Sequence, residues 1–316
     1  MSFFKKTIFW IIILAAIGGA FLVFTKEEEK IEIRREEEKS LLRFEPEDIS
    51  SFAIKRGDII IECQDGSNGW HITKPVKADG DKDAFDRFFR MVVKAKFDGV
   101  LFEEHQKEKL AEFGLEKPYL EIEFKLKNNK KPVTLYFGDR GPTQNIAFAM
   151  VSDDKRFFRL HSDIRAEADK DAYALRDKTI LLIDPIKARG VAIIRPEGKI
   201  VMEQPIQGRW DFTEPEGSGI VNVAKLMELL YKVKSSKAKA FIEEDPKDLK
   251  KYGLDNPKIK LNVWSGGKNP PEVLLIGGRD KALRGYYAKR ELVANVFLLE
   301  EDFIDILPKA AKEMAE

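Results

Sequence analysis

The residues of this sequence that could do acid–base or metal chemistry are few and widely spaced. Histidine occurs three times, as His71, His105 and His161, and Cys63 is the only cysteine. A structural zinc site needs several such ligands at short spacing, and an internal disulfide needs a second cysteine. The sequence therefore predicts no metal site, no disulfide and no bound cofactor.

Common catalytic motifs are also missing from the sequence. It contains no glycine-rich phosphate-binding loop, no zinc-protease helix and no nucleophile elbow around a serine. We therefore expect that the protein is not an enzyme and that it has no catalytic residues. The alternative is an unfamiliar hydrolase, which would have to draw on His71, His105 and Asp211.

The composition is that of folded domains. Of the 316 residues, 43% are hydrophobic and 34% are charged, which favours globular structure over disorder. This length is comfortable for two domains. Lysine and arginine number 55 against 54 acidic residues, so no overall positive field favours nucleic acid, and we expect no nucleic-acid partner.

The N-terminus contains the longest apolar stretch of the chain. Residues 7–24 read TIFWIIILAAIGGAFLVF and carry no charge. As a helix, this stretch would be about 27 Å long, close to the hydrocarbon thickness of a bilayer. Lys5 and Lys6 precede it, which favours a cytoplasmic N-terminus and exported domains. The sequence thus predicts a cytoplasmic tip and transmembrane anchor over residues 1–25, with the following domains exported.

Two other interpretations of this region stay open. A cleaved signal peptide ending at Ala20 is the alternative to an anchor, although it would leave the apolar residues FLVF on the mature chain. Residues 26–43 begin with a mixed-charge run that is typical of a solvated stalk. A segment that binds lipid headgroups is the alternative for that run, and its many acidic residues weigh against it.

The rest of the chain repeats itself at an offset of 139 to 141 residues. The paired segments, first copy before second, are GDIIIEC (57–63) and GKIVMEQ (198–204), GWHITKP (69–75) and RWDFTEP (209–215), FGLEKP (113–118) and YGLDNP (252–257), LYFGD (135–139) and LLIGG (274–278), and FFRLHSDI (157–164) and VFLLEEDF (296–303). Because several segments recur in the same order, the sequence indicates an internal duplication.

Each copy is expected to combine short strands with two helices. Phe85, Phe88, Phe89 and Val92 have the spacing of an amphipathic helix, and Leu226, Leu229, Leu230 and Val233 repeat it. Asp81 and Asn222 stand where a side chain can cap the first free amides of these helices. Short apolar runs separated by turn residues indicate antiparallel strands around the helices.

The repeated tryptophans, glycines and prolines are candidate structural anchors. Gly114 and Gly253 are expected to end a short helix in the left-handed conformation, with Pro118 and Pro257 preventing its resumption. Trp70 and Trp210 are interpreted as core residues where a strand packs over its helix, with Pro75 and Pro215 ending the strand. The alternative is that each tryptophan stacks on a ligand.

One short segment has no counterpart in the second copy. Arg176, Asp177 and Lys178 follow a leucine near the end of copy one, and they either close a helix or form a docking contact for a partner. Both interpretations stay open.

Together these patterns predict an α+β protein, with an N-terminal transmembrane helix followed by two tandem copies of a unit of antiparallel sheet plus helices. The expected divisions are the anchor at 1–25, the charged stalk at 26–43, repeat one at 44–187, repeat two at 188–308 and a C-terminal tail at 309–316.

The repeated motifs resemble a family of unknown function named DUF4340. That family has a tryptophan strand ending in proline, a Tyr-Gly-Leu turn ending in proline, a hydrophobic-Gly strand end and a late Arg-Asp-Lys. The matching positions here are Trp70 to Pro75, Phe113 to Pro118 with phenylalanine in place of tyrosine, Phe137-Gly138 and Arg176 to Lys178, and in the second copy Trp210 to Pro215, Tyr252 to Pro257 and Ile276-Gly277. The second copy lacks the last element.

The resemblance covers most of residues 50–303. It implies a bacterial inner-membrane or envelope protein with one N-terminal span, whose domains we expect in the periplasm. It also implies an association with ABC-type export systems, including those related to gliding motility. It supplies no catalytic residue. We therefore expect a non-catalytic accessory or scaffolding subunit whose partners are the membrane and an ABC permease or ATPase. The alternative is an extracytoplasmic module that binds a lipid, glycan or peptide in a cleft between the repeats.

Overall fold

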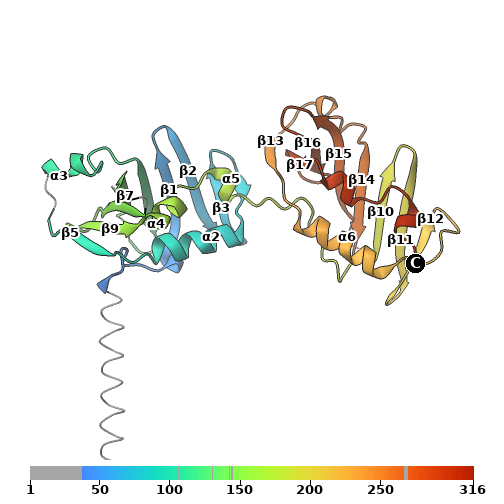
Figure 1. The fold of residues 1–316 in the computed structure, drawn as a ribbon, viewed down its shortest axis with the longest axis horizontal. Coiled ribbons are helices and arrows are strands. Elements are labelled where there is room, and N and C mark those ends of the chain that lie inside the picture. Colours follow the sequence, from blue (N-terminus) through green and yellow to red (C-terminus); the bar gives the residue numbers. More distant parts are fainter. Residues whose placement is uncertain (1–37, 105–106, 130, 142, 144, 267–269) are drawn as a thin grey trace, which may run out of the picture. The chain divides into compact units, whose positions relative to one another are not determined.

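The computed structural model describes residues 38–316, apart from 105–106, 130, 142, 144 and 267–269 (Figure 1). The described chain divides into two compact units, and the division falls between Arg176 and Asp177. Each unit has its own hydrophobic core, so each is treated as a separate structure below.

The first unit is built on one nine-stranded antiparallel sheet. Its strands lie in the order β4-β3-β2-β1-β6-β7-β8-β9-β5. The strands are β1 (Ile49–Arg56), β2 (Ile59–Gly66), β3 (Gly69–Lys74), β4 (Ala78–Asp79), β5 (Gly99–Phe102), β6 (Leu120–Leu126), β7 (Val133–Arg140), β8 (Ile146–Val151) and β9 (Phe157–His161). The helical segments are η1 (Pro46–Asp48), α2 (Lys82–Phe88), the π-helical turn η2 (Phe89–Val93), α3 (Lys107–Glu112), α4 (Ser162–Ala168) and α5 (Ala172–Leu175).

The second unit is built on an eight-stranded antiparallel sheet in the order β12-β11-β10-β14-β15-β16-β17-β13. The strands are β10 (Gly190–Arg195), β11 (Gly198–Ile206), β12 (Arg209–Glu214), β13 (Ala240–Glu243), β14 (Ile259–Trp264), β15 (Glu272–Asp280), β16 (Gly285–Arg290) and β17 (Val296–Glu300). The helical segments are α6 (Val223–Ser235), η3 (Lys250–Tyr252), α7 (Phe303–Ile306) and η4 (Ala311–Glu313).

In the first unit, α2 and η2 cover one face of the sheet, which we call the inner face. Successive strand residues point to opposite faces, so Phe52 and Ile54 of β1 point inward together. Phe52 stacks on Phe88 with ring centroids 4.9 Å apart. The helix begins where predicted, because the Asp81 carboxylate accepts a hydrogen bond from the Ala84 amide at 3.0 Å.

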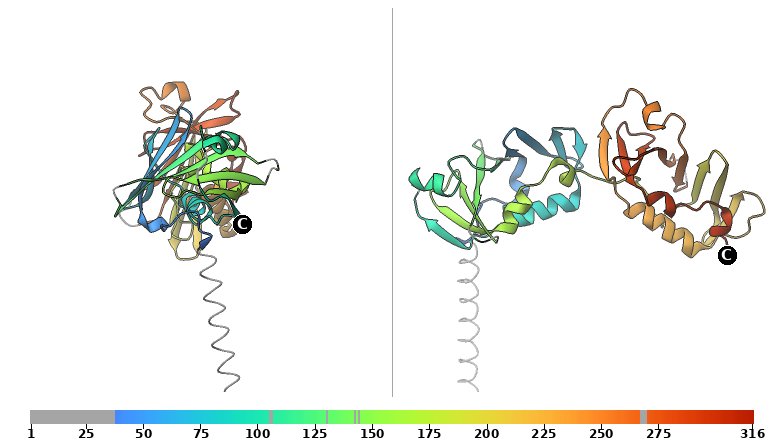
Figure 2. Two further views of the ribbon diagram at one scale, coloured as in Figure 1. Left: turned by 90° about the vertical axis from the view of Figure 1, so that its left-hand side faces the viewer. Right: turned by 45° about the horizontal axis from the view of Figure 1, so that its top comes forward.

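In the second unit, α6 takes the corresponding place along the sheet (Figure 2). All four residues of its predicted apolar stripe are buried, namely Leu226, Leu229, Leu230 and Val233. Its predicted cap is also confirmed, since Asn222 Oδ1 accepts a hydrogen bond from the Lys225 amide at 3.1 Å. The local helical pattern was therefore sufficient to locate both main helices.

The two units have the same topology. Without the two-residue strand β4, the first sheet has the order β3-β2-β1-β6-β7-β8-β9-β5 and the second has the order β12-β11-β10-β14-β15-β16-β17-β13. In both sheets the first three strands of the unit lie in reverse order from one edge, and four consecutive strands follow them. The strand that comes after the main helix lies at the other edge. In each unit the first strand also pairs antiparallel with both neighbours, β1 with β2 and β6, and β10 with β11 and β14. The duplication inferred from the sequence is thus confirmed by the connectivity.

The predicted fold class, α+β with an N-terminal transmembrane helix, is wrong. The described chain is mostly two antiparallel sheets with few helices, of which the longest, α6, has 13 residues. Each helical segment covers only part of a sheet face, so helices contribute much less of the chain than strands do. Within the described ranges, no helix is long and apolar enough to cross a membrane. The stretch 7–24 lies outside the described residues.

The units also extend beyond the limits expected for the repeats. Leu41 and Leu42, from the expected stalk, are buried in the first core. Ile180 and Leu181 belong to the second core, although repeat two was expected to begin at 188. In the expected C-terminal tail, Met314 is buried and its carbonyl accepts a hydrogen bond from the Asn222 amide at 2.7 Å. Apolar residues in these flanking segments complete the cores.

Candidate functional site

The two repeated tryptophans lie in the cores of their units. Trp70 is half-buried, and its ring stacks on Phe85 with centroids 5.6 Å apart and planes 15° apart. Trp210 is 2% exposed and packs in the second core. Their backbones are equivalent too, because the Trp70 carbonyl accepts from the Gly80 amide at 2.9 Å and the Trp210 carbonyl from the Val221 amide at 3.0 Å. The Trp210 ring is therefore closed to a ligand, and the Trp70 ring is stacked on Phe85 on one side.

The prolines after these tryptophans follow the last residues of β3 and β12. Both peptide bonds, Lys74-Pro75 and Glu214-Pro215, are cis. Pro118 and Pro257 are half-buried and stand just before β6 and β14. All four prolines thus mark element boundaries, at equivalent places in the two units.

Gly114 and Gly253 have the left-handed conformation that the sequence predicts, with φ of 66° and 65°. The hydrogen bonds around them are those of a Schellman motif. The Gly253 amide donates to the Lys250 carbonyl at 2.9 Å, and the Leu254 amide donates to the Leu249 carbonyl at 3.1 Å. The first unit repeats this pattern from Leu110 to Leu115, and both turn leucines are buried.

The segment from Arg176 to Lys178 joins the two units. Arg176 is 7% exposed, and its backbone bridges to Gly80. Asp177 accepts hydrogen bonds from the Thr179 amide at 2.9 Å and from the Thr179 hydroxyl at 2.7 Å. The Lys178 carbonyl accepts from the Ala238 amide at 2.8 Å. All three residues therefore have contacts within the chain, and a docking role for them stays a prediction.

The residues named for a hydrolase are not brought together within either unit. His71 Nδ1 lies 3.0 Å from the Asp79 carboxylate on β4, and Asp211 pairs with Arg209 in the second unit. His161 caps α4 by accepting from the Asp163 amide at 3.3 Å. His105 lies outside the described residues. Among the described side chains, no group of three or more His, Cys, Asp or Glu is arranged to hold a metal ion.

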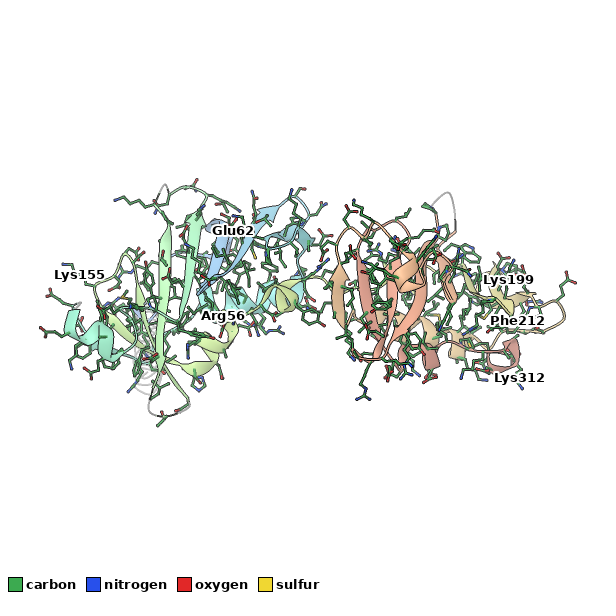
Figure 3. The ribbon with its side chains drawn as sticks, turned by 90° about the horizontal axis from the view of Figure 1, so that it is seen from above. Arg56, Glu62, Lys155, Lys199, Phe212 and Lys312 are labelled. Carbon is green, nitrogen blue, oxygen red and sulfur yellow. The ribbon has the colours of Figure 1, made fainter. Side chains whose placement is uncertain are left out.

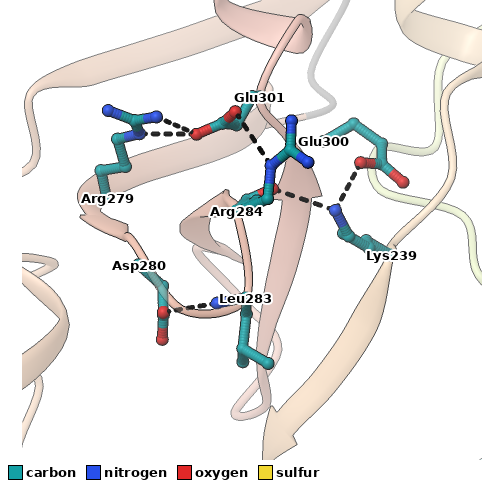
Figure 4. A network of polar contacts seen from close by, with 7 residues as sticks. All are labelled: Lys239, Arg279, Asp280, Leu283, Arg284, Glu300 and Glu301. Carbon is teal, nitrogen blue, oxygen red and sulfur yellow. Dashed lines mark hydrogen bonds and ion pairs between the residues drawn. The ribbon is translucent and has the colours of Figure 1, made fainter.

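The turn between β15 and β16 carries a network of charged residues (Figure 4). Glu301 is paired with Arg279 and lies 3.9 Å from Arg284, while Lys239 donates to Glu300 at 2.8 Å. These side chains are exposed or partly exposed, so each pair stabilises the fold by only about 0–1 kcal/mol. The acidic and basic side chains of the network pair with one another and so stabilise the turn. We do not assign a ligand to this network.

A polar groove on the first sheet is the best candidate site. It lies on the outer face of the sheet, opposite α2, and has a volume of about 320 Å³. Figure 3 marks Glu62 on β2, one of its walls. The residues bordering the groove come from four adjacent strands and are Ser51, Phe52, Ala53 and Lys55 of β1, Glu62, Cys63 and Gln64 of β2, Thr73 of β3, and Glu123 and Lys125 of β6.

Strand register explains how these residues meet. Ser51 lies opposite Gln64 on one side and Lys125 on the other. Ala53 lies between Glu62 and Glu123 in the same way. Opposite residues on neighbouring strands have Cβ atoms about 5 Å apart, so each trio forms a row across three strands. The short side chain of Ala53 leaves open space between the two glutamates.

The carboxylates of the groove are held by lysines. Lys55 donates to Glu123 at 2.6 Å, and Lys74 donates to Glu62 at 2.8 Å. The hydrogen bond to Glu123 raises the pKa of the Lys55 ammonium above its ordinary value, although partial burial opposes this. Lys125, in contrast, forms no side-chain hydrogen bond or ion pair with any part of the chain that the structure describes. The groove therefore holds two oriented carboxylates and one uncommitted cation.

The same face of the second unit has different chemistry. By strand register, Ser51 corresponds to Gly190 and Lys125 to Trp264, because both pairs lie opposite each other. The Trp264 ring lies directly over Gly190, where a β-carbon would stand 1.9 Å from the ring. Glu62 corresponds to Val201 and Glu123 to Asn262. An aromatic ring thus occupies the place that is a groove in the first unit.

The groove residues were not singled out from the sequence. Shared motifs consist of positions at which the two copies have similar residues, whereas the groove residues differ between the copies. The available signal is the alternation in β6, LEIEFKL, which places Glu121, Glu123 and Lys125 on one face. It does not reveal which residues of β1 and β2 lie beside them.

The fold and the groove define the class of protein: a duplicated antiparallel β protein with one polar groove and one aromatic face on equivalent strands. The chain belongs to the family described as Domain of unknown function (DUF4340), whose model matches residues 70–220 and again residues 210–316. The first matched region begins within the first unit and extends into the second, and the second matched region lies within the second unit. No curated protein and no solved structure matches the chain.

Proposed function

We propose that the chain is a non-catalytic accessory or scaffolding subunit of an ABC-type transport system in the bacterial envelope. The proposal rests on the duplication and on the association that the family resemblance implies. Its periplasmic location at the inner membrane stays a prediction.

The observation that carries the proposal is the difference between the outer faces of two otherwise matching sheets. The first presents charged residues around Ala53, and the second presents the Trp264 ring over Gly190, on the same face as Ile194 and Val201. The two units share topology and helix placement, so the fold does not require either surface. A chain with two chemically different faces on one repeated scaffold is suited to contacting two different surfaces, as a scaffolding subunit must.

A pull-down from native membranes in gentle detergent tests this proposal. The expected result is near-stoichiometric recovery of an ABC permease and ATPase, identified by mass spectrometry. Trp264→Ala is expected to reduce recovery of one partner at least several-fold, because aromatic residues at interfaces contribute strongly to binding. Tyr231→Ala, which removes an exposed aromatic ring elsewhere on the same unit, is the control and should leave recovery unchanged.

Recovery of the protein alone, with intact transporter complexes remaining in the extract, would contradict the proposal. Equal recovery of the partners with Trp264→Ala and Tyr231→Ala would mean that the contact does not involve Trp264. The outer face of the second unit would then no longer support the proposal.

A second candidate function is an extracytoplasmic binding module for a lipid, glycan or peptide. The specific observation in its favour is the groove of about 320 Å³, which falls at the lower end of the sizes of small-molecule sites. The sequence led us to expect such a ligand between the repeats, whereas this groove lies within the first unit.

A further inference from the structure

The two residue rows of the groove offer opposite hydrogen-bonding chemistry. The first row contains the Gln64 amide, the Ser51 hydroxyl and the Lys125 ammonium. None of these three side chains forms a hydrogen bond or ion pair with another described residue. All three can donate, so together they suit a carboxylate, which only accepts hydrogen bonds.

The second row contains the carboxylates of Glu62 and Glu123, on either side of Ala53. Lys74 engages Oε1 of Glu62, and Lys55 engages Oε2 of Glu123. Each carboxylate keeps a second oxygen that can accept further hydrogen bonds. A ligand ammonium above Ala53 would lie between these two acceptors.

The spacing of the rows sets the size of the ligand. Ser51 and Ala53 are two residues apart on β1, so the rows are about 7 Å apart along the strand. Two residues of extended peptide span at most about 7 Å. The free amino and carboxyl ends of a dipeptide therefore match the acidic row and the donor row respectively.

We propose that the outer groove of the first unit binds a short peptide with free ends, of dipeptide size, with its carboxylate at Lys125, Ser51 and Gln64 and its ammonium between Glu62 and Glu123. This site gives the second candidate function a ligand class. It does not depend on a transport partner, so the pull-down and the binding experiment below can fail independently.

Comparison with the second unit shows that the side chains of the donor row and the acidic row are not needed to build the fold. At the equivalent places it has Gly190 under Trp264 in the donor row and Val201 and Asn262 in the acidic row. The same sheet therefore forms without either row. This difference also supplies a control surface within the same molecule.

The test is calorimetric titration of the purified full chain with alanyl-alanine, together with the same dipeptide acetylated at its amino end, amidated at its carboxyl end, or blocked at both. We expect the free dipeptide to bind with one site per chain. Blocking either end should weaken binding about tenfold or more, because each block removes a charge-assisted hydrogen bond.

Lys125→Met removes the ammonium while keeping the apolar stem, and we expect it to weaken binding of the free dipeptide about tenfold or more. It should not affect binding of the amidated dipeptide, which lacks the carboxylate. Lys260→Met, on the outer face of the second unit, is the matched control and should bind like the unaltered chain. Ala53→Leu should abolish binding by filling the groove, with folding checked by circular dichroism.

Three results would overturn the proposal. These are no binding of the free dipeptide by the folded chain, equal binding of the free and doubly blocked dipeptides, or unchanged affinity in folded Lys125→Met. Because Lys125 is exposed, that variant keeps the test informative even if Ala53→Leu does not fold.

Discussion

Gly277 lies directly against the carbonyl oxygen of Tyr252, and a β-carbon on Gly277 would stand 2.2 Å from that oxygen. The first unit repeats the arrangement, because a β-carbon on Gly138 would stand 2.0 Å from the Phe113 carbonyl oxygen. Two separate family motifs, the Tyr-Gly-Leu turn and the hydrophobic-Gly strand end, therefore contact each other. The left-handed turn after Tyr252 docks onto the sheet at the only residue type that lets the backbones approach so closely.

We therefore predict that Gly277→Ala destabilises the protein. The added methyl overlaps backbone, which cannot rotate away, and overpacking of this kind costs about 1–3 kcal/mol. Gly278→Ala is the matched control, because its β-carbon would make an ordinary contact at 3.4 Å with the same oxygen. Urea denaturation should show a lower midpoint for Gly277→Ala than for Gly278→Ala. Equal midpoints would mean that the turn is not docked on this strand.

The turn is supported by different chemistry in the two units. In the first, Phe113 meets Phe148 edge to face with centroids 4.6 Å apart, and Phe102 also contacts Phe113 at 5.8 Å. In the second, Tyr252 meets Tyr287 at 4.9 Å. The Tyr252 hydroxyl donates to Glu243, and the Tyr287 hydroxyl donates to Asp280. Aromatic packing is kept in the second unit, and polar pairs are added at its edge.

This arrangement predicts a pH dependence. The hydrogen bond to the Asp280 carboxylate, with burial, raises the pKa of Tyr287 to about 12 from an ordinary value of 10.0. The stability that this hydrogen bond provides is fully present below pH 10, where tyrosine is protonated in both folded and unfolded chains. It is lost as pH rises from 10 through about 12, because the unfolded chain releases its proton first.

The ultraviolet absorbance change of tyrosine ionisation, compared between the unaltered chain and Tyr287→Phe, gives the titration of this one residue. We expect a midpoint near pH 12, and a lower midpoint in Asp280→Ala. A Tyr287 midpoint near 10 in the folded chain would show that the hydrogen bond to Asp280 is not formed.

The single cysteine leads to a third prediction. Cys63 is 1% exposed, and burial raises the pKa of its thiol to about 12. Because the thiolate is the reactive form, we expect the folded protein to react with a thiol-specific disulfide reagent at pH 8 only as fast as it opens. Addition of denaturant should make the reaction immediate. Immediate reaction without denaturant would contradict the inward orientation of Cys63 on β2.

Those features that depend on neighbouring residues in the chain were predictable. The stripe on α6, its cap at Asn222 and the left-handed Gly253 are all local, and the sequence predicts each of them. The proportion of helix was overestimated, because a helix that covers one face of a wide sheet needs few residues. The family was also predictable, since its motifs are short but keep their order.

Features that depend on strand pairing were not predictable. The sequence pairs Ile61 with Met202, whereas strand register makes Ile61 equivalent to Ile200. Both strands alternate with a period of two, so a shift by two residues preserves the apolar pattern and looks equally good. The groove has the same origin, because Ser51, Gln64 and Lys125 become neighbours only when three strands are aligned.

The last prediction concerns Gly190 and Trp264, which distinguish the second outer face from the first. A β-carbon at Gly190 would overlap the indole at 1.9 Å, so Gly190→Ala must displace the ring. We expect a loss of about 1–3 kcal/mol from overpacking. In the Trp264→Ala background the obstruction is gone, and the same glycine substitution should cost much less. The four denaturation curves of this double-mutant cycle measure the coupling. Additive effects would mean that the ring does not lie on Gly190, whereas strong coupling would establish that glycine was required there to admit the tryptophan.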